Sequence, residues 1–137
     1  MSATSSGTNV VLAGATGVVG SRVLPRLLAR ADVARVTAVG RRPPAQTDPK
    51  LATPVVDLRD VAALVDAMPT GIDCALCCLG TTMKRAGSKE AFRAVDYDAV
   101  LAFARAARQQ GARRFLLVSS AGASARSGNF YLKTKGE

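Results

Sequence analysis

The stretch VVLAGATGVVG at residues 10–20 runs from an apolar segment, typical of a buried strand, into three glycines with the spacing G-x-x-G-x-x-G. A segment with helical periodicity follows at residues 18–30. In this context Gly14 permits a tight turn, Gly17 lets the backbone approach a pyrophosphate, and Gly20 lets the helix pack close to the sheet. The helix N-terminus adds amide donors and a partial positive charge.

The stretch therefore predicts a dinucleotide-binding turn. The alternative is a tight strand-to-helix turn that binds nothing. The residues expected to bind the dinucleotide here are Gly14, Thr16, Gly17, Val18, Val19 and Gly20.

Beyond this turn, short apolar runs alternate with longer Ala-, Leu- and Arg-rich segments of helical period. Such alternation is typical of a parallel sheet covered by helices. The expected strands are residues 9–13, 35–39, 53–57, 73–79 and 113–119. The expected helices are residues 18–30, residues 60–67 with Asp60 as the cap, and one long or bent helix over residues 88–111. The first helix is expected to bury Val19, Val23, Leu27 and Leu28.

These elements predict the α/β class, with a Rossmann-type doubly wound parallel sheet of about five strands and helices on both faces. A single NAD(P)-binding domain over residues 1–137 accounts for all of them. The continuous apolar run FLLV of the last strand predicts a buried parallel position for it.

The composition is that of an ordinary globular domain, with 48% hydrophobic and 21% charged residues. Nineteen Lys and Arg against ten Asp and Glu give a net charge of +9. No basic run is longer than Arg41-Arg42 or Arg113-Arg114, and only 4% of residues are aromatic. The chain thus has few side chains on which bases could stack, and we do not expect it to bind nucleic acid. We expect the charge to attract a polyanionic small molecule instead.

The first eight residues are small and polar, and no later stretch approaches the ~20 apolar residues of a membrane span. We therefore expect a cytoplasmic protein. We also expect it to be a monomer or a homodimer and to act on a small-molecule substrate.

Cys74, Cys77 and Cys78 lie inside an apolar run, and the chain has no His, so buried strand cysteines are expected rather than a metal or redox site.

Two arginines follow the second expected strand in the sequence Val39-Gly40-Arg41-Arg42. An NAD-type fold would place an acidic side chain here, about 20 residues after the first glycine. The forked donors of Arg41 and Arg42 match the oxygens of a 2′-phosphate instead. The pair predicts NADP(H) as the cofactor, and the alternative is a solvated basic loop.

Further candidate residues follow the third and fourth expected strands. Asp57 could accept a hydrogen bond from the adenine amino group, or it could cap the following turn. The glycine and hydroxyls of Leu79-Gly80-Thr81-Thr82 stand at the carboxyl end of the sheet, where open α/β sheets bind ligands. The added cofactor-binding candidates are Asp57, Leu58, Leu79, Gly80 and Thr81.

Tyr131 and Lys135 stand four residues apart, after Ser119-Ser120 at the end of the fifth expected strand. On a helix Tyr131 and Lys135 share a face, so the lysine can stabilise a phenolate and hold the nicotinamide ribose. A strand-end serine hydroxyl can then steady a substrate carbonyl. Alone, this pattern suits an ordinary surface helix, but downstream of the glycine turn it predicts a catalytic pair.

The blocks GATGVVGSRVL, VGRRPP, CCLGTTMKRAGSKEAFRAVDYDAV, FLLVSSAGA and NFYLKTKGE resemble, in this order, the atypical branch of the short-chain dehydrogenase/reductase superfamily that holds the Tat-interacting protein 2-like oxidoreductases. The resemblance implies an NADP(H)-binding Rossmann fold. It also implies Tyr131 as general acid/base, Lys135 as its partner and Ser120 as the hydroxyl that orients the carbonyl.

The chain departs from that superfamily in two places. Asp96 stands where many members carry an Asn in the helix before the fifth strand, so their proton relay through that position is not carried over. Relatives also continue past the Tyr-x-x-x-Lys helix, whereas this chain stops at Gly136-Glu137. We therefore expect a truncated chain in which the Tyr131 helix has barely begun and the fifth strand lacks an outer neighbour.

Two functions fit these observations. The first is an NADPH-dependent oxidoreductase that transfers hydride to or from a small carbonyl or hydroxyl substrate. The second is a non-catalytic module that senses NADP(H) or binds another protein, which agrees with the missing substrate region and with the regulatory roles that the resemblance associates with the family's human member. NADPH oxidation that depends on both substrate and Tyr131 separates the two.

Overall fold

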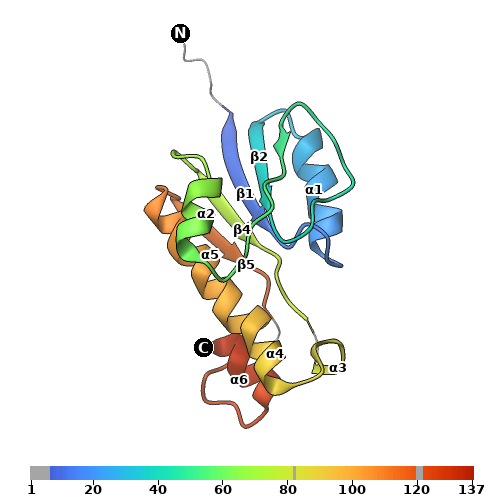
Figure 1. Cartoon of the computed structure of the whole chain (residues 1–137), viewed down its shortest axis with the longest axis vertical. Coiled ribbons are helices and arrows are strands. Elements are labelled where there is room, and N and C mark those ends of the chain that lie inside the picture. The colour runs from blue at the N-terminus through green and yellow to red at the C-terminus, as the bar shows by residue number, and fades with distance from the viewer. Residues whose placement is uncertain (1–6, 82, 120–121) are drawn as a thin grey trace.

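Five parallel strands form one sheet in the order β3-β2-β1-β4-β5 (Figure 1). The computed structural model describes residues 7–81, 83–119 and 122–137. The strands are β1 (Thr8–Ala13), β2 (Val33–Val39), β3 (Leu51–Ala52), β4 (Cys74–Cys77) and β5 (Arg114–Leu117). The helices are α1 (Gly20–Ala29), α2 (Val61–Ala67), α3 (Met83–Ala86), α4 (Lys89–Arg93), the π-helical segment η2 (Ala94–Ala99), α5 (Val100–Gln109) and α6 (Phe130–Gly136). This strand order confirms the predicted Rossmann-type α/β fold.

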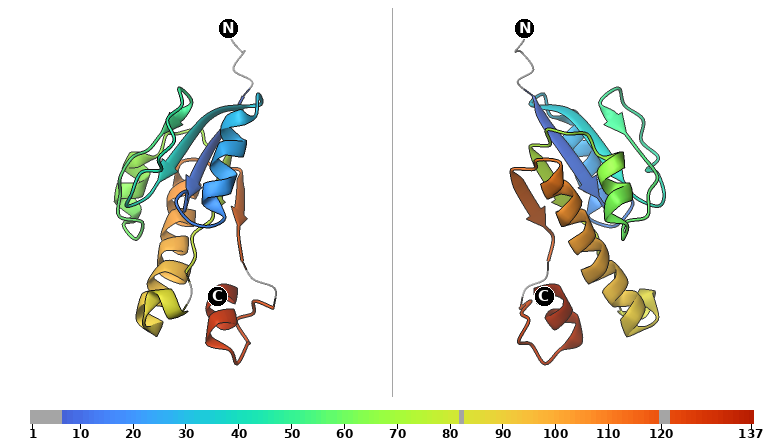
Figure 2. Two further views of the ribbon diagram at one scale, coloured as in Figure 1. Left: turned by 90° about the vertical axis from the view of Figure 1, so that its right-hand side faces the viewer. Right: turned by 60° about the vertical axis from the view of Figure 1, so that its left-hand side comes forward.

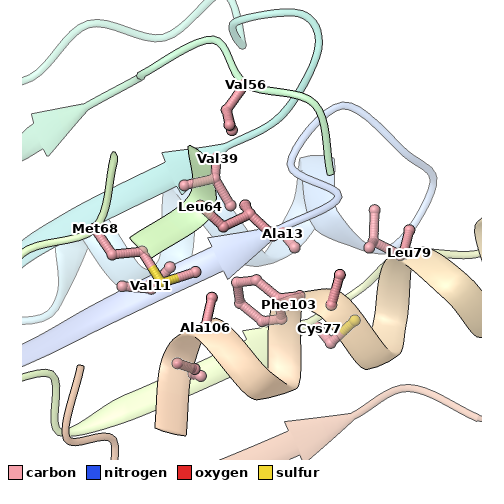
Figure 3. Packing of buried hydrophobic residues seen from close by; sticks show 14 of the residues in the cluster. Val11, Ala13, Val39, Val56, Leu64, Met68, Cys77, Leu79, Phe103 and Ala106 are labelled. Carbon is pink, nitrogen blue, oxygen red and sulfur yellow. The ribbon is translucent and has the colours of Figure 1, made fainter. Parts of the chain in front are cut away.

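The side chains of the central strand β1 pack on both faces of the sheet. Val10 and Leu12 belong to the cluster that includes Leu24 of α1. Val11 belongs to the opposite cluster, which Phe103 of α5 and residues of α2 complete (Figure 3). Figure 2 shows α1 on one side of the sheet and α2 and α5 on the other. Because successive residues of a strand point to opposite faces, a central strand covered on both sides reads as one apolar run.

The buried face of α1 differs from the prediction. Leu24 is fully buried, whereas Val19 is 41% exposed. Val19 precedes the helix and belongs to the turn, so the helical periodicity does not extend to it. Val23, Leu27 and Leu28 pack against the core as predicted.

The third predicted strand is displaced. β3 covers only residues 51–52, and within the predicted range 53–57 the chain makes one isolated bridge, between Gly40 and Val55. Pro54 has no N–H to donate to the ladder, which limits pairing in this segment. The prediction of a regular strand there is wrong.

The predicted helix starts are confirmed where a side chain caps them. Asp60 accepts a hydrogen bond from Ala63 N at 3.1 Å, and Ser88 accepts one from Ala91 N at 3.0 Å. The run that begins after Ser88 continues through α4, η2 and α5, so the long helix contains a π-helical segment. Among the described residues no helix has the length and apolar character needed to cross a membrane.

β5 lies at the edge of the sheet, so the buried position predicted from its apolar run is wrong, whereas the expectation that it lacks an outer neighbour agrees with the described strands. Phe115, Leu116 and Leu117 are 39%, 57% and 43% exposed. β5 pairs with β4 on one side, and no other described strand pairs with β5. Burial of a parallel strand requires a second neighbour, and the apolar character of its own residues does not provide one.

Candidate functional site

A cleft of about 200 Å³ lies at the carboxyl ends of the strands, between the turn that precedes α1 and helix α6. Figure 1 shows α6 beyond the carboxyl ends of β4 and β5. The order of the strands reverses between β1 and β4, which is where open α/β sheets bind ligands. The cleft is lined by Gly17, Val18, Val19, Cys78, Leu79, Gly80, Thr81, Arg85, Val118, Ser119, Tyr131 and Lys135.

The cleft therefore gathers predicted residues from four separate segments of the chain: the turn before α1, the loop after β4, the segment after β5, and α6. Cys78, Arg85 and Val118 also line it and were not predicted. Cys78 and Val118 directly precede predicted residues, so their positions at strand ends were a usable signal, whereas nothing in the sequence marks Arg85. A larger hollow of about 430 Å³ between α5 and β5 contains no predicted site residue.

Two of the three glycines in the turn are required by the fold itself. Gly14 has φ +87°, and a Cβ there would lie 2.6 Å from the carbonyl carbon of Cys78. A Cβ on Gly20 would lie 1.8 Å from the carbonyl oxygen of Gly14. Both positions exclude a side chain because backbone atoms already fill the space.

Gly17 is different, because the fold places no demand on it. A Cβ there would meet only the Gly14 carbonyl oxygen, at an ordinary contact distance of 3.5 Å. Gly17 lines the cleft, so its missing side chain leaves room on the ligand side of the turn. A group that approaches the backbone closely, such as a pyrophosphate, fits this cradle.

The N-terminus of α1 is also suited to an anionic ligand. Val19 at the N-cap supplies no side-chain hydrogen bond, and the first turn of α1 contains no acidic residue. Ser21 N and Arg22 N already donate hydrogen bonds to the carbonyl oxygens of Gly17 and Val19. What this ten-residue helix offers an anion is therefore the partial positive charge of its N-terminus. Val18 and Val19 at this end are 69% and 41% exposed and line the cleft.

The other cofactor candidates lie outside the cleft lining. Arg41 and Arg42 are exposed in the loop after β2, and Thr16 is exposed within the turn. Asp57 accepts a hydrogen bond from Arg59 N at 2.9 Å, which is the capping role that the sequence left as its alternative. Leu58 packs against the core.

Helix α6 holds Tyr131 and Lys135 on one face. Lys135 Nζ lies 5.5 Å from the centroid of the Tyr131 ring. Asn129 caps the helix by accepting a hydrogen bond from Leu132 N at 3.1 Å. The Tyr131 ring packs on Phe92 with a centroid distance of 5.2 Å. The helix is therefore formed over the seven residues Phe130–Gly136, capped at its start and packed against Phe92.

The serine proposed to orient a carbonyl, Ser120, lies outside the described residues, as does Thr82. Its neighbour Ser119 lines the cleft. The described part of the chain thus places a hydroxyl from the end of β5 in the same cleft as Tyr131.

Asp96 of η2 is a fully buried carboxylate behind the cleft. Its Oδ2 accepts a hydrogen bond from Thr81 N at 3.0 Å, and its Oδ1 forms an ion pair with the Lys135 ammonium. Asp96 is therefore in direct contact with the predicted catalytic lysine.

Cys74 and Cys77 lie in β4, and Cys77 is buried as predicted. Cys74 is only partly buried, and Cys78 follows the strand, is partly buried and lines the cleft, so the prediction of buried strand cysteines is correct for Cys77 alone. Burial raises the pKa of the Cys77 thiol to about 11 and also raises the pKa values of Cys74 and Cys78 above 9.0. Because the thiolate is the reactive form, these thiols are weak nucleophiles at neutral pH. The described residues contain no cluster of side chains able to hold a metal ion.

Solved structures share the fold at low sequence identity. The Bordetella bronchiseptica enzyme WbmG, solved in complex with NAD, superposes with a TM-score of 0.73 and 16% identity over 99% of this chain and 50% of its own. This likeness supports the fold assignment alone.

Two curated relatives are closer in sequence. The mitochondrial protein fmp52 of Aspergillus fumigatus is 39% identical over 135 residues, covering 94% of this chain and 57% of the relative. Protein HTATIP2 of Rattus norvegicus is 35% identical over 131 residues, covering 94% and 54%. The chain thus spans about half the length of the curated relatives it matches. The resemblance read from the sequence blocks is confirmed.

The cytoplasmic location expected from the sequence is contradicted by these comparisons. The fungal relatives at 36–39% identity are named as mitochondrial proteins.

A family model described as NAD(P)H-binding matches residues 14–135. The match begins at the first glycine of the turn and ends at the lysine of α6, so it includes every wall of the cleft. The chain belongs to the NAD(P)H-binding family.

Proposed function

We propose that the chain binds NADP(H) in this cleft and is the cofactor domain of an oxidoreductase that acts on a small carbonyl or hydroxyl compound. The observation that carries the proposal is that Gly17, the end of β4 and the Tyr131–Lys135 pair line one cleft. Residues 1–137 would act as a single NAD(P)-binding domain, in a monomer or a homodimer.

Each wall of the cleft has a distinct role in this proposal. The turn at Gly17 and the N-terminus of α1 would hold the pyrophosphate, and Lys135 would hold the nicotinamide ribose. The bound cofactor supplies the hydride. Tyr131 would donate its hydroxyl proton to the carbonyl oxygen as that oxygen becomes an alcohol, and the strand-end hydroxyl of Ser120 would orient the carbonyl.

We predict that the chain prefers NADPH to NADH because Arg41 and Arg42 follow β2 where an acidic residue would otherwise contact the ribose. Charge-assisted contacts to the 2′-phosphate should make NADPH binding about ten- to a hundredfold tighter. The double variant Arg41→Ala/Arg42→Ala should lose this preference while binding NADH as before. Calorimetric titration of both cofactors measures it.

A matched control separates a specific phosphate site from the overall positive charge. Arg105 and Arg108 are exposed on α5, and replacing both by Ala removes the same charge without touching the β2 loop. The control variant should keep the preference for NADPH. The assignment of Arg41 and Arg42 would be contradicted if the native chain bound NADPH and NADH with equal affinity. It would also be contradicted if both double variants lost the preference for NADPH to the same extent.

A non-catalytic NADP(H)-sensing module is the second candidate. The observation that favours it is the ion pair with Asp96, which offsets the charge of Lys135 beside Tyr131. An oxidoreductase should oxidise NADPH with a carbonyl substrate and lose this activity in Tyr131→Phe, whereas a sensing module should bind NADPH equally well in both forms and show no turnover in either.

A further inference from the structure

Asp96 joins three segments of the chain at one buried point. Its side chain is fully buried in η2. Oδ2 accepts the hydrogen bond from Thr81 N, at 3.0 Å, which connects it to the loop after β4. Oδ1 faces the ammonium of Lys135, its only partner of opposite charge among the described residues.

The ion pair lies directly behind the surface of the cleft. A Cβ added to Gly80 would come within 3.2 Å of Lys135 Nζ and 3.5 Å of Asp96 Oδ1. Gly80 and Lys135 line the cleft, but Asp96 does not. Asp96 can therefore influence a ligand only through the groups that it holds.

Stability alone does not account for this arrangement. Removing a carboxylate and an ammonium from water carries a desolvation penalty, and the attraction between the two charges often fails to exceed it. A pair of apolar residues of the same volume would often stabilise a fold at least as well as a buried ion pair. The pair instead fixes a long, flexible lysine side chain, only 10% exposed, at the wall of a ligand cleft. Asp96 also lies in the π-helical segment η2, and such segments, which are rare, often occur at functional sites.

We propose that Asp96 is the positioning residue for Lys135. The Thr81 amide holds Asp96 Oδ2, and Oδ1 in turn holds the ammonium where it can reach both Tyr131 and the ribose of the cofactor. The ligand named here rests on the proposed function, whereas the anchoring of Lys135 by Asp96 does not.

The anchoring is tested without cofactor, by acetylation of lysines with a water-soluble active ester and mass spectrometry of the full chain. Asp96→Asn keeps the shape of the side chain and an oxygen for Thr81 N, but it removes the charge. Loss of a charge-assisted contact should raise the acetylation rate of Lys135 about tenfold or more. Lys133, exposed on the same helix, is the internal control and should react at an unchanged rate. An unchanged rate at Lys135 would overturn the proposal, whether or not the chain binds NADPH.

The consequence for the ligand is tested by a double-mutant cycle read out as NADPH affinity. If Asp96 acts through Lys135, Asp96→Asn should weaken NADPH binding about tenfold in the native background and have no further effect in a Lys135→Met background. The double variant leaves no unpaired buried charge. A purely structural role predicts the same loss in both backgrounds and would overturn positioning.

Circular dichroism and urea unfolding confirm that each variant is folded. If Asp96→Asn does not fold, Gly80→Ala replaces it in the acetylation experiment, because its Cβ presses on Lys135 Nζ from the cleft side and leaves Asp96 intact. Faster acetylation of Lys135 in Gly80→Ala supports a lysine held in that one position, and an unchanged rate contradicts it. If the native chain does not bind NADPH, the proposed function fails while the acetylation result still decides the role of Asp96.

Discussion

Gly17→Val should abolish NADPH binding, with an affinity at least about a hundredfold weaker, in a protein that remains folded. The valine side chain would fill the space on the ligand side of the turn, where backbone amides would otherwise meet the pyrophosphate. The fold should tolerate the change, because a Cβ at Gly17 meets only the Gly14 carbonyl oxygen at 3.5 Å. Fluorescence titration with NADPH measures the affinity, and circular dichroism measures the fold.

Gly128→Val is the matched control for this variant. A Cβ at Gly128 meets nothing within 4 Å, and Gly128 does not line the cleft. Its affinity for NADPH should equal that of the native chain. Full binding by a folded Gly17→Val protein would show that the turn does not hold the pyrophosphate.

Gly20→Ala should have the opposite effect and damage the fold rather than the ligand site. The added Cβ would overlap the carbonyl oxygen of Gly14 at 1.8 Å and its carbonyl carbon at 2.6 Å. Backbone atoms in a tight turn have little freedom to move, so we expect the free energy of unfolding to fall by about 3 kcal/mol or more. Urea denaturation measures this loss.

Gly128→Ala again supplies the control, and it should change the free energy of unfolding by less than about 0.5 kcal/mol. If Gly20→Ala unfolds at the same urea concentration as the native chain, the close approach of α1 to the turn is not a requirement of the fold. The contrast between Gly17 and Gly20 would then have no physical basis.

Elements that depend mainly on neighbouring residues could be predicted from the sequence. Asp60 and Ser88 cap helices because a side-chain oxygen reaches an amide three residues later, and that geometry depends only on neighbouring residues. β1 was predictable because strands covered on both faces are apolar throughout. The shift of β3 away from Pro54 follows a local rule that the apolar pattern alone did not include.

Features that depend on distant parts of the chain were not predictable. The apolar run of β5 does not reveal whether a second strand pairs with it. The expectation that it lacks an outer neighbour came from the resemblance to longer relatives and not from the strand's own residues, and the structure places it at the edge. In the site, spacing predicted that Tyr131 and Lys135 share a helix face. No spacing connects Asp96 to Lys135, because only the packing of α6 against η2 and the loop after β4 brings them together.

The most direct test of an NADP(H) site in this cleft is a thiol footprint of the native chain with and without NADPH. Cys78 lines the cleft and Cys74 does not, although both are partly buried. Burial raises the pKa of both thiols above 9.0, so their thiolate fractions, and hence their alkylation by iodoacetamide, should increase as the pH rises towards and beyond that value. The reaction is therefore run near the alkaline end of the range in which the protein stays folded.

NADPH at about ten times its dissociation constant should slow the alkylation of Cys78 by about tenfold, because the bound fraction is protected. The alkylation rate of Cys74 should not change, because Cys74 does not line the cleft and bound NADPH would not cover it. NADPH could slow the alkylation of Cys74 only by stabilising the whole fold. Selective protection of Cys78 is the result that we predict. Equal rates at Cys78 with and without NADPH, or equal protection of both thiols, would contradict binding of the cofactor in this cleft.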